Sequence, residues 1–370
     1  MKFWYVPAML LLFGVQTVQA GDYTLEQALA ETRENPASEP LSLSRALALA
    51  EKRSEAVRAQ KAAADAAQSE AVAAGELPDP MLNLEVSNIP ANGPDQFSLA
   101  ADFMTMRGVG ISQTFTRQDK RKAQANVFSK NAEVAQASGL SALSRVRTST
   151  AQAYLDNVYL QQMLELLQRQ RTEIQLQIDA ADALYRAGKA PQTEVFAART
   201  ELGLLDLRIQ DTQAMLANAQ ADLQRWVGVS ANGELLDNTN LAQSRLGKAD
   251  LNESLNRHPE IIALQKAEDA ALANAEVKLQ EKSADWTLSV MYAGRGPEFS
   301  EMLTLGASRP LFVDQSSRQD QAVAAANSMA AKARSERIEL YRDYLAQTQR
   351  WQQTWQSNLK RLADFDNSLI

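Results

Sequence analysis

Four stretches of the chain alternate between apolar and polar residues, and a β-strand is predicted in each, at about 81–87, 108–115, 286–292 and 302–309. Because successive side chains in a strand point to opposite faces, each strand has one apolar face and one polar face. This pattern is typical of a strand with lipid on one side and water on the other. It also fits two half-buried hairpins on a soluble helical protein. The apolar positions are Leu82, Leu84, Val86, Val109, Ile111, Trp286, Leu288, Val290, Leu303 and Leu305.

Long helical patterns separate the strands. A helix is predicted over 43–74, where the turn-forming sequence GELPDP ends it. An antiparallel coiled-coil hairpin is predicted over about 119–227, because apolar residues recur at heptad spacing on both sides of the turn RAGKAP. Arg171 and Thr212 are the polar exceptions. The heptad residues are Leu160, Leu164, Leu167, Ile174, Ile178, Ala181 and Tyr185 before the turn, and Val195, Ala198, Leu202, Leu205, Ile209, Leu216, Ala219, Leu223 and Trp226 after it.

The chain contains an internal duplication. Ala56–Val86 and Ile261–Met291 each carry a helix that ends in a strand, and the tripeptide Gln-Lys-Ala recurs in them at 60–62 and 265–267. A second strand and then a long helix follow in each case, the second of these helices from about Gln315. The sequence therefore predicts two repeats of helix, strand, strand and long helix.

The first 20 residues have the features of a secretory signal peptide. Lys2 is followed by a short apolar run, and VQA before Gly21 matches a cleavage site. A cleaved signal is expected, with a retained anchor as the alternative. The predicted organisation is a signal peptide at 1–20, a first repeat at 21–228, a linker at 229–250 and a second, incomplete repeat at 251–370.

Four strands are too few for a closed barrel, since the smallest single-chain barrels use about eight. Other subunits must complete the sheet, and three copies would supply twelve strands. The helices are too long for a compact globule. The predicted fold is therefore mainly α with four β-strands, in which a membrane barrel is joined to a helical tube.

Composition and charge narrow the possible functions. Apolar residues make up 45% of the chain but aromatic residues only 6%, which suits long helices packed side by side more than a large globular core. The net charge of −7, without a basic patch, argues against nucleic acid as a partner. The chain has no Cys, so a disulfide scaffold, a thiolate nucleophile and a lipid-accepting Cys are excluded.

The residues form no recognisable catalytic constellation, and neither an enzyme nor a cofactor or metal site is predicted. The one His, His258, is interpreted as a surface residue at a helix start. Met104 and Met106 have two interpretations, which are contact with a soft metal ion or packing near a barrel mouth.

The turn of the hairpin resembles a known family. Its sequence, YRAGKAPQTEVFAA, is similar to the periplasmic tip pattern Y-R-x-G-x-x-(S/P)-x-x-(D/E)-V-x-x-A of the TolC family of outer-membrane efflux proteins. The segments LSLSRALALAEKRSEAVRA and LPDPMLNLEV are also family-like, and MTMRGVGISQTF resembles the heavy-metal (CzcC-like) branch. The resemblance covers residues 41–370.

The resemblance implies a passive exit duct in the outer membrane of a Gram-negative bacterium, extending into the periplasm. It implies a homotrimer, in which a trimeric α-helical barrel is joined to a 12-stranded outer-membrane β-barrel surrounded by outer-membrane lipid. This trimer docks on a periplasmic adaptor protein and so works indirectly with an inner-membrane pump. The cargo, metal ions or small toxic compounds, stays open, as do the pump and the residues of the closed constriction. The implied adaptor-docking residues are Tyr185, Arg186, Gly188, Lys189, Pro191, Glu194 and Val195.

The sequence departs from the family pattern at its end. The second long helix is still helical in pattern at Ile370, before a second tip. A C-terminally truncated duct is therefore expected. Two alternatives are a non-functional fragment of a duct and a periplasmic coiled-coil adaptor or structural protein, which would share the hairpin.

Overall fold

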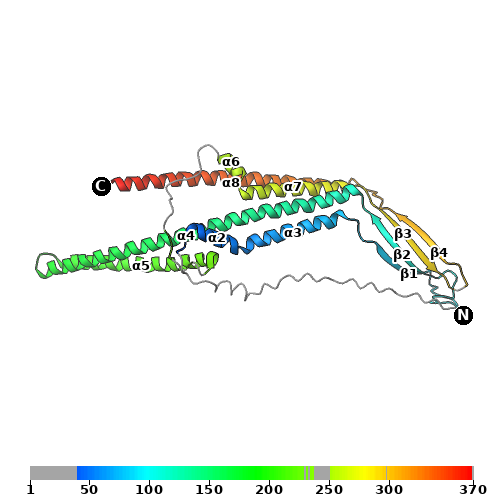
Figure 1. The fold of residues 1–370 in the computed structure, drawn as a ribbon, viewed down its shortest axis with the longest axis horizontal. Coiled ribbons are helices and arrows are strands. Elements are labelled where there is room, and N and C mark those ends of the chain that lie inside the picture. Colours follow the sequence, from blue (N-terminus) through cyan, green and yellow to red (C-terminus); the bar gives the residue numbers. More distant parts are fainter. Residues whose placement is uncertain (1–39, 229–230, 232–233, 237–250, 297, 369–370) are drawn as a thin grey trace. The chain divides into compact units, whose positions relative to one another are not determined.

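The computed structural model describes residues 40–228, 231, 234–236, 251–296 and 298–368 (Figure 1). It contains two compact units, which divide the first predicted repeat between them. One unit holds Gln152–Asp237 with the segment that ends at Ala46, and the other holds Leu47–Ala151 and Asn238–Ile370, as far as these are described. The predicted signal peptide lies outside the described residues, and so does the predicted linker apart from residues 231 and 234–236.

The second unit contains a single antiparallel sheet of four strands in the order β1-β2-β3-β4 (Figure 1). The prediction of four strands is confirmed. β2 begins earlier than predicted and β3 ends later, because Met106 pairs with Ser87 and Gly294 pairs with Arg107. The strands are β1 Met81–Ser87, β2 Met106–Phe115, β3 Trp286–Gly294 and β4 Met302–Ser308.

The register places the apolar positions of the four strands in rows on one face of the sheet. One row is Leu82, Ile111, Val290 and Leu305, and the next is Leu84, Val109, Tyr292 and Leu303. Side chains on the opposite face are linked across strands. Asn83 Nδ2 donates to Ser112 Oγ at 3.0 Å, and the hydroxyls of Thr114 and Thr287 lie 2.9 Å apart.

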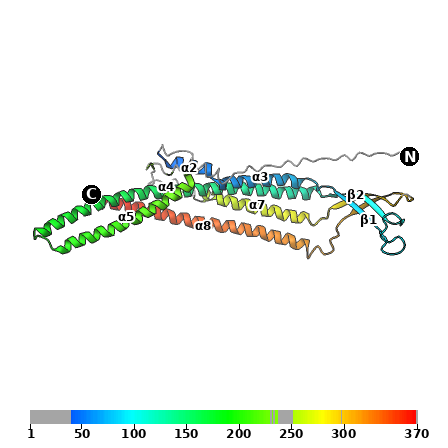
Figure 2. The ribbon, with the colours of Figure 1, turned by 90° about the horizontal axis from the view of Figure 1, so that it is seen from below.

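Helices from both repeats pack together in the same unit. They are α3 Glu55–Gly75, the first part of α4 Gln118–Arg186, α6 Leu251–Asn256, α7 Pro259–Gln280 and α8 Gln319–Ser368. α7 and α8 lie side by side (Figures 1 and 2). Ion pairs cross the helix contacts, since Lys266 Nζ lies 2.8 Å from Glu133 Oε2 and Arg337 Nε lies 2.9 Å from Glu268 Oε2.

The prediction of one helix over 43–74 is wrong. The structure has α2 Leu43–Arg53 and α3 Glu55–Gly75, separated by Ser54. Ser54 has an extended backbone, with φ −70° and ψ 104°, and its side chain accepts a hydrogen bond from the Val57 N–H. This serine satisfies a free donor at the start of a new helix, so it is an N-cap and not a helix interior.

The other unit is built on the helical hairpin of α4 and α5 Gln192–Val227 (Figure 2). Its core contains Leu167, Leu205 and Ile209, and all three were predicted heptad positions. At the far end of the hairpin from its turn, the Tyr154 hydroxyl lies 2.8 Å from the Leu41 carbonyl oxygen and 2.7 Å from that of Leu236. Leu41 also forms a parallel bridge with Leu235. The segment before α4 and the segment after α5 are therefore bonded to each other at the base of the hairpin.

None of the helices described in the structure combines the length and the apolarity needed to cross a bilayer.

Candidate functional site

The turn between α4 and α5, residues 185–195, is called the tip. Gly188 has φ +70°, a left-handed conformation that glycine adopts without steric cost. The Lys189 N–H donates to the Leu184 carbonyl and the Gly188 N–H to the Tyr185 carbonyl, both at 2.9 Å. These two bonds form a Schellman motif, which satisfies the last carbonyls of α4.

The second half of the tip begins α5. Pro191 is the N-cap residue, with φ −74° and ψ 151°, and Glu194 lies in the first turn, where its negative charge complements the positive end of the helix. The Glu194 N–H donates to the Pro191 carbonyl at 3.2 Å. The tip is therefore a short turn fixed by its own backbone.

The tip side chains divide into an exposed group and a buried one. Tyr185 and Lys189 are exposed. Arg186 pairs with Asp182 at 2.5 Å, yet its side chain remains 77% exposed. Val195 is buried, so it holds the two helices together from inside and offers no contact surface. Of the residues implied by the family resemblance, the exposed ones can reach a partner.

An ion pair joins the two helices of the hairpin at the polar position of the heptad pattern. Arg171 Nε donates to Asp206 Oδ1 at 2.7 Å across the pair of helices. The carboxylate raises the pKa of Arg171, so its charge is stable at every physiological pH. Thr212, the other polar heptad residue, is satisfied by donating to the Arg208 carbonyl at 2.8 Å.

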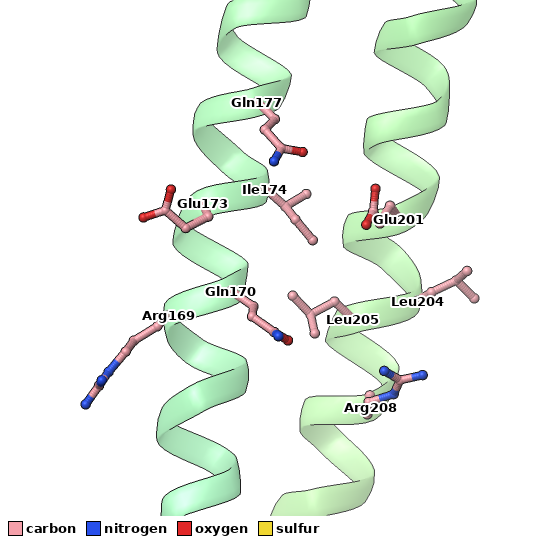
Figure 3. Close-up of a pocket in the computed structure, with 9 residues that line it drawn as sticks. All are labelled: Arg169, Gln170, Glu173, Ile174, Gln177, Glu201, Leu204, Leu205 and Arg208. Atoms are coloured by element: carbon pink, nitrogen blue, oxygen red, sulfur yellow. The ribbon is translucent and has the colours of Figure 1, made fainter. Parts of the chain in front are cut away.

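A groove of about 600 Å³ runs between α4 and α5. Figure 3 shows Gln170, Ile174 and Leu205 pointing into the space between the helices, whereas Arg169 and Leu204 point away. Charged groups of both signs border an apolar floor. Such a surface suits a helical protein partner with complementary charges. The lining residues are Arg169, Gln170, Glu173, Ile174, Gln177, Glu201, Leu204, Leu205 and Arg208.

The sheet has two chemically distinct faces, which are called the apolar face and the polar face. All ten apolar positions predicted from the sequence share the apolar face, and Leu84 and Leu305 on it are 76% and 73% exposed. An exposed apolar surface that crosses a whole sheet marks a contact with lipid or with another protein. The polar face carries Asn83, Glu85, Ser112, Thr287, Ser289, Thr304 and Ser308, the glycines Gly108, Gly110 and Gly306, and the methionines Met81, Met106, Met291 and Met302.

A polar cluster that sequence reasoning did not find joins three helices of the same unit. Glu260 on α7 accepts a hydrogen bond from the Tyr344 hydroxyl of α8, and its other oxygen lies 3.2 Å from Arg145 Nε of α4. Burial and the nearby carboxylate raise the pKa of Tyr344 to about 12. The partners are far apart in the sequence, so no local pattern could have indicated the cluster.

The same cluster explains His258. The prediction of a helix-start residue is confirmed, because His258 is the N-cap of α7 and its Nδ1 accepts from the Glu260 N–H at 3.3 Å. Its ring also packs against that of Tyr344 in a tilted arrangement, with centroids 4.4 Å apart, so it is half-buried and not a free surface residue. Within the described residues, no three His, Asp or Glu side chains lie close enough together to hold a metal ion.

Comparison with known proteins gives the family context. The family model described as "Outer membrane efflux protein" matches residues 46–229. No curated protein matches the chain.

Several solved structures share the fold of this chain. The outer membrane protein VceC from Vibrio cholerae is 15% identical, with a TM-score of 0.68 over 88% of this chain and 81% of VceC. CusC, described in connection with transmembrane channel formation, is 16% identical, with a TM-score of 0.66 over 88% of this chain and 80% of CusC. The CmeC channel of Campylobacter jejuni is 14% identical, with a TM-score of 0.60 over 82% of this chain and 68% of CmeC. At these identities the likeness concerns the fold.

Proposed function

Because the chain belongs to the TolC family of outer membrane efflux proteins, we propose that it is the exit duct of a tripartite efflux system. Three copies form a closed duct in the outer membrane, and the helices extend it into the periplasm. The observation that carries the proposal is the four-stranded sheet with one apolar face, one polar face and two edges that no described strand covers.

The strand order fits closure by identical copies. The sheet runs β1-β2-β3-β4 with every pair antiparallel, so β4 of one copy is antiparallel to β1 of the next when the copies stand in a ring. An uncovered edge exposes unpaired N–H and C=O groups, and full closure removes this cost. Three copies give twelve strands, which is within the range of barrels that enclose a channel.

The two faces of the sheet then have separate roles. The apolar face, with Trp286 and Leu288 at one end and Leu84 and Leu303 at the other, contacts lipid, and the polar face lines the duct. Trp286 suits the interface between lipid and water, where aromatic residues are enriched. Arg309 lies over the Trp286 ring at 5.5 Å, which places a positive charge where lipid headgroups begin.

The helical hairpin provides the contact with the adaptor. Docking on the exposed tip residues Tyr185, Arg186 and Lys189, together with the groove between α4 and α5, orients the adaptor at the entrance of the duct. Gly188, Pro191, Glu194 and Val195 fix the shape of this surface. The predicted organisation of two repeats with a linker at 229–250 and a leader at 1–20 belongs to the same proposal.

The cargo is a metal ion or a small toxic compound. The duct itself does no chemistry, and the pump selects most of what passes. The resemblance of MTMRGVGISQTF to the heavy-metal branch favours metal ions.

Two substitutions on neighbouring residues test the proposal. A charge on the lipid face of a barrel strand costs about 2–4 kcal/mol near the bilayer midplane, whereas the face that lines the channel tolerates it. Leu305→Arg should therefore reduce the amount of protein in the outer-membrane fraction, and Thr304→Arg on the other face should leave it unchanged. Equal amounts of both variants there, or a wild-type chain found only as a soluble periplasmic protein, would contradict a lipid-facing sheet and favour the soluble adaptor.

A further inference from the structure

Three methionines gather at one end of the polar face of the sheet. Met302 of β4 lies opposite Ala293 of β3, and Met291 is the next residue of β3 on this face. Met106 is the first residue of β2 on the same face, next to Gly108. The remaining residues of this face are small or polar apart from Met81 at the opposite end, so the three thioethers form the one large apolar cluster on the described sheet's polar side.

The structure places the Met291 side chain over Gly108, which follows Met106 on this face of β2 and lies in the same cross-strand row as Met302. The Met291 sulfur lies 3.0 Å, and its Cγ 3.2 Å, from the point where a Cβ at Gly108 would stand. Gly108 lies two residues from Met106 on β2 and pairs with Ala293 of β3, so the Met291 thioether occupies space that any other residue at 108 would fill. Diagonal neighbours on a sheet face lie within reach of long side chains, so Met302 can approach the same point across Ala293.

The three methionine side chains are at least partly exposed to solvent. Ala293 is buried, whereas Met302 is 43% exposed and Met106 and Met291 are half-buried. In the row that crosses the sheet here, Glu85 lies on the far side of Gly108 and supplies a negative charge. Arg295, which follows β3, donates to the Ser300 carbonyl at 3.0 Å within the turn to β4.

We propose that Met106, Met291 and Met302 form a transit site for a soft monovalent metal ion, Cu⁺ or Ag⁺. The inference rests on the proposed function, in which the polar face lines the duct. Thioether sulfur is a soft, polarisable and neutral ligand, so it favours soft ions over Mg²⁺, Ca²⁺ or Mn²⁺, which prefer oxygen ligands. Three neutral thioether ligands, with no thiolate among them, bind the ion reversibly. A site through which a transported ion passes requires this release.

The ligand chemistry has a consequence for pH dependence. Metal binding by His, Cys or carboxylates weakens in acid because these ligands must first lose a proton. A thioether carries no such proton. The affinity for Ag⁺ should therefore change little between pH 7 and pH 4, whereas binding by carboxylate ligands would weaken as the pH approaches about 4, the ordinary pKa of such groups.

The test uses the full chain purified in detergent and Ag⁺ as the probe, with binding measured by isothermal titration calorimetry. The variant M106L/M291L/M302L removes the three sulfur atoms at nearly constant volume. The control M81L/M215L/M329L removes three sulfur atoms elsewhere, including the one at the opposite end of the polar face. We expect saturable Ag⁺ binding by the wild-type chain and the control and its loss in the first variant.

Gly108→Ala is a second test of the site, and it keeps all three methionines in the chain. A Cβ at 108 displaces the Met291 thioether, so this variant should bind Ag⁺ more weakly than the wild-type chain. No Ag⁺ binding by the wild-type chain, or equal binding by the wild-type chain and M106L/M291L/M302L, would overturn the transit site. The outer-membrane fraction of the same cells separates the two proposals, since a chain that is present there but binds no Ag⁺ refutes the site alone.

Discussion

Single residues fix the ends of helices and the contacts between them. Gly188 ends α4 by adopting φ +70°, and Ser54 separates α2 from α3 by capping the second helix. Glu260 connects α4, α7 and α8 through Arg145 and Tyr344. Each of these roles depends on one conformation or one functional group, so a small substitution should have a measurable effect.

Gly188→Ala should lower the stability of the tip. An L-residue in the left-handed region costs about 1–2 kcal/mol, and Asn tolerates this region better than Ala. The expected order of thermal stability is therefore wild type, then Gly188→Asn, then Gly188→Ala, measured by circular dichroism of the full chain in detergent. Since a Cβ at 188 meets no atom within 4 Å, a loss of stability would come from the backbone conformation and not from a steric clash. Equal stability of all three would contradict the left-handed conformation.

Tyr344→Phe should destabilise the chain at neutral pH and remove one late step from its alkaline titration. The pKa of Tyr344 is raised from 10.0 to about 12, so the folded state favours the protonated phenol. This stabilisation is complete below the unfolded pKa and is lost as the pH rises through the folded pKa. Absorbance at 295 nm, recorded from pH 9 to pH 13, measures the step. Tyr341→Phe is the matched control in α8, and an unchanged titration in Tyr344→Phe would contradict the assignment.

At the scale of elements, strands and the hairpin could be predicted because their signals are local. Period-2 alternation and heptad spacing are properties of neighbouring residues, and a Gly and a Pro mark the tip turn. The break at Ser54 was missed because a serine inside a helical pattern does not reveal whether it caps a new helix. The Glu260 cluster was missed for another reason, since its members come from three helices that only the tertiary structure brings together.

The link between α4 and α7 should weaken in acid. Hydrogen bonds from Lys130 and then Lys266 lower the pKa of Glu133 below its ordinary value of 4.5. A carboxylate with a lowered folded pKa stabilises the native state above the unfolded pKa, and this contribution is lost as the pH falls through the folded pKa. Glu133→Gln should therefore lower the melting temperature more at pH 7 than at pH 3. An equal loss at both values would show that the ion pairs do not matter.

Truncating a leucine of α5 should destabilise the chain strongly only where that leucine belongs to the core of the hairpin. Leu205 is 7% exposed and belongs to the core with Leu167 and Ile209, whereas its neighbour Leu204 is 64% exposed. Leu205→Ala should cost about 2–5 kcal/mol, because it leaves a cavity, and Leu204→Ala should cost much less. Chemical denaturation of both variants measures the difference. Similar values would mean that the heptad register of the hairpin is wrong.

At the scale of the whole molecule, the proposed duct depends on closure of the sheet, and one chain cannot close it. The register within the chain fixes which residues share a face, but the register between β4 of one copy and β1 of the next depends on contacts that a single chain does not contain. The sequence indicates a ring through the number of strands and the family resemblance, and the edges of β1 and β4, which no strand among the described residues covers, agree with it.

The most direct measurement is disulfide cross-linking between these two edges in cells. The chain has no Cys, so any disulfide between copies must come from the introduced cysteines. With Asn83→Cys on β1 fixed, a second cysteine is placed in turn at 302, 304, 306 and 308 on β4. Within one copy the two strands are about 14 Å apart, three strand spacings, which is beyond the reach of a disulfide. A closed ring should give cross-linked dimers and trimers in the outer-membrane fraction at one or two of these positions, and no cross-link at any of them would contradict a closed trimeric duct.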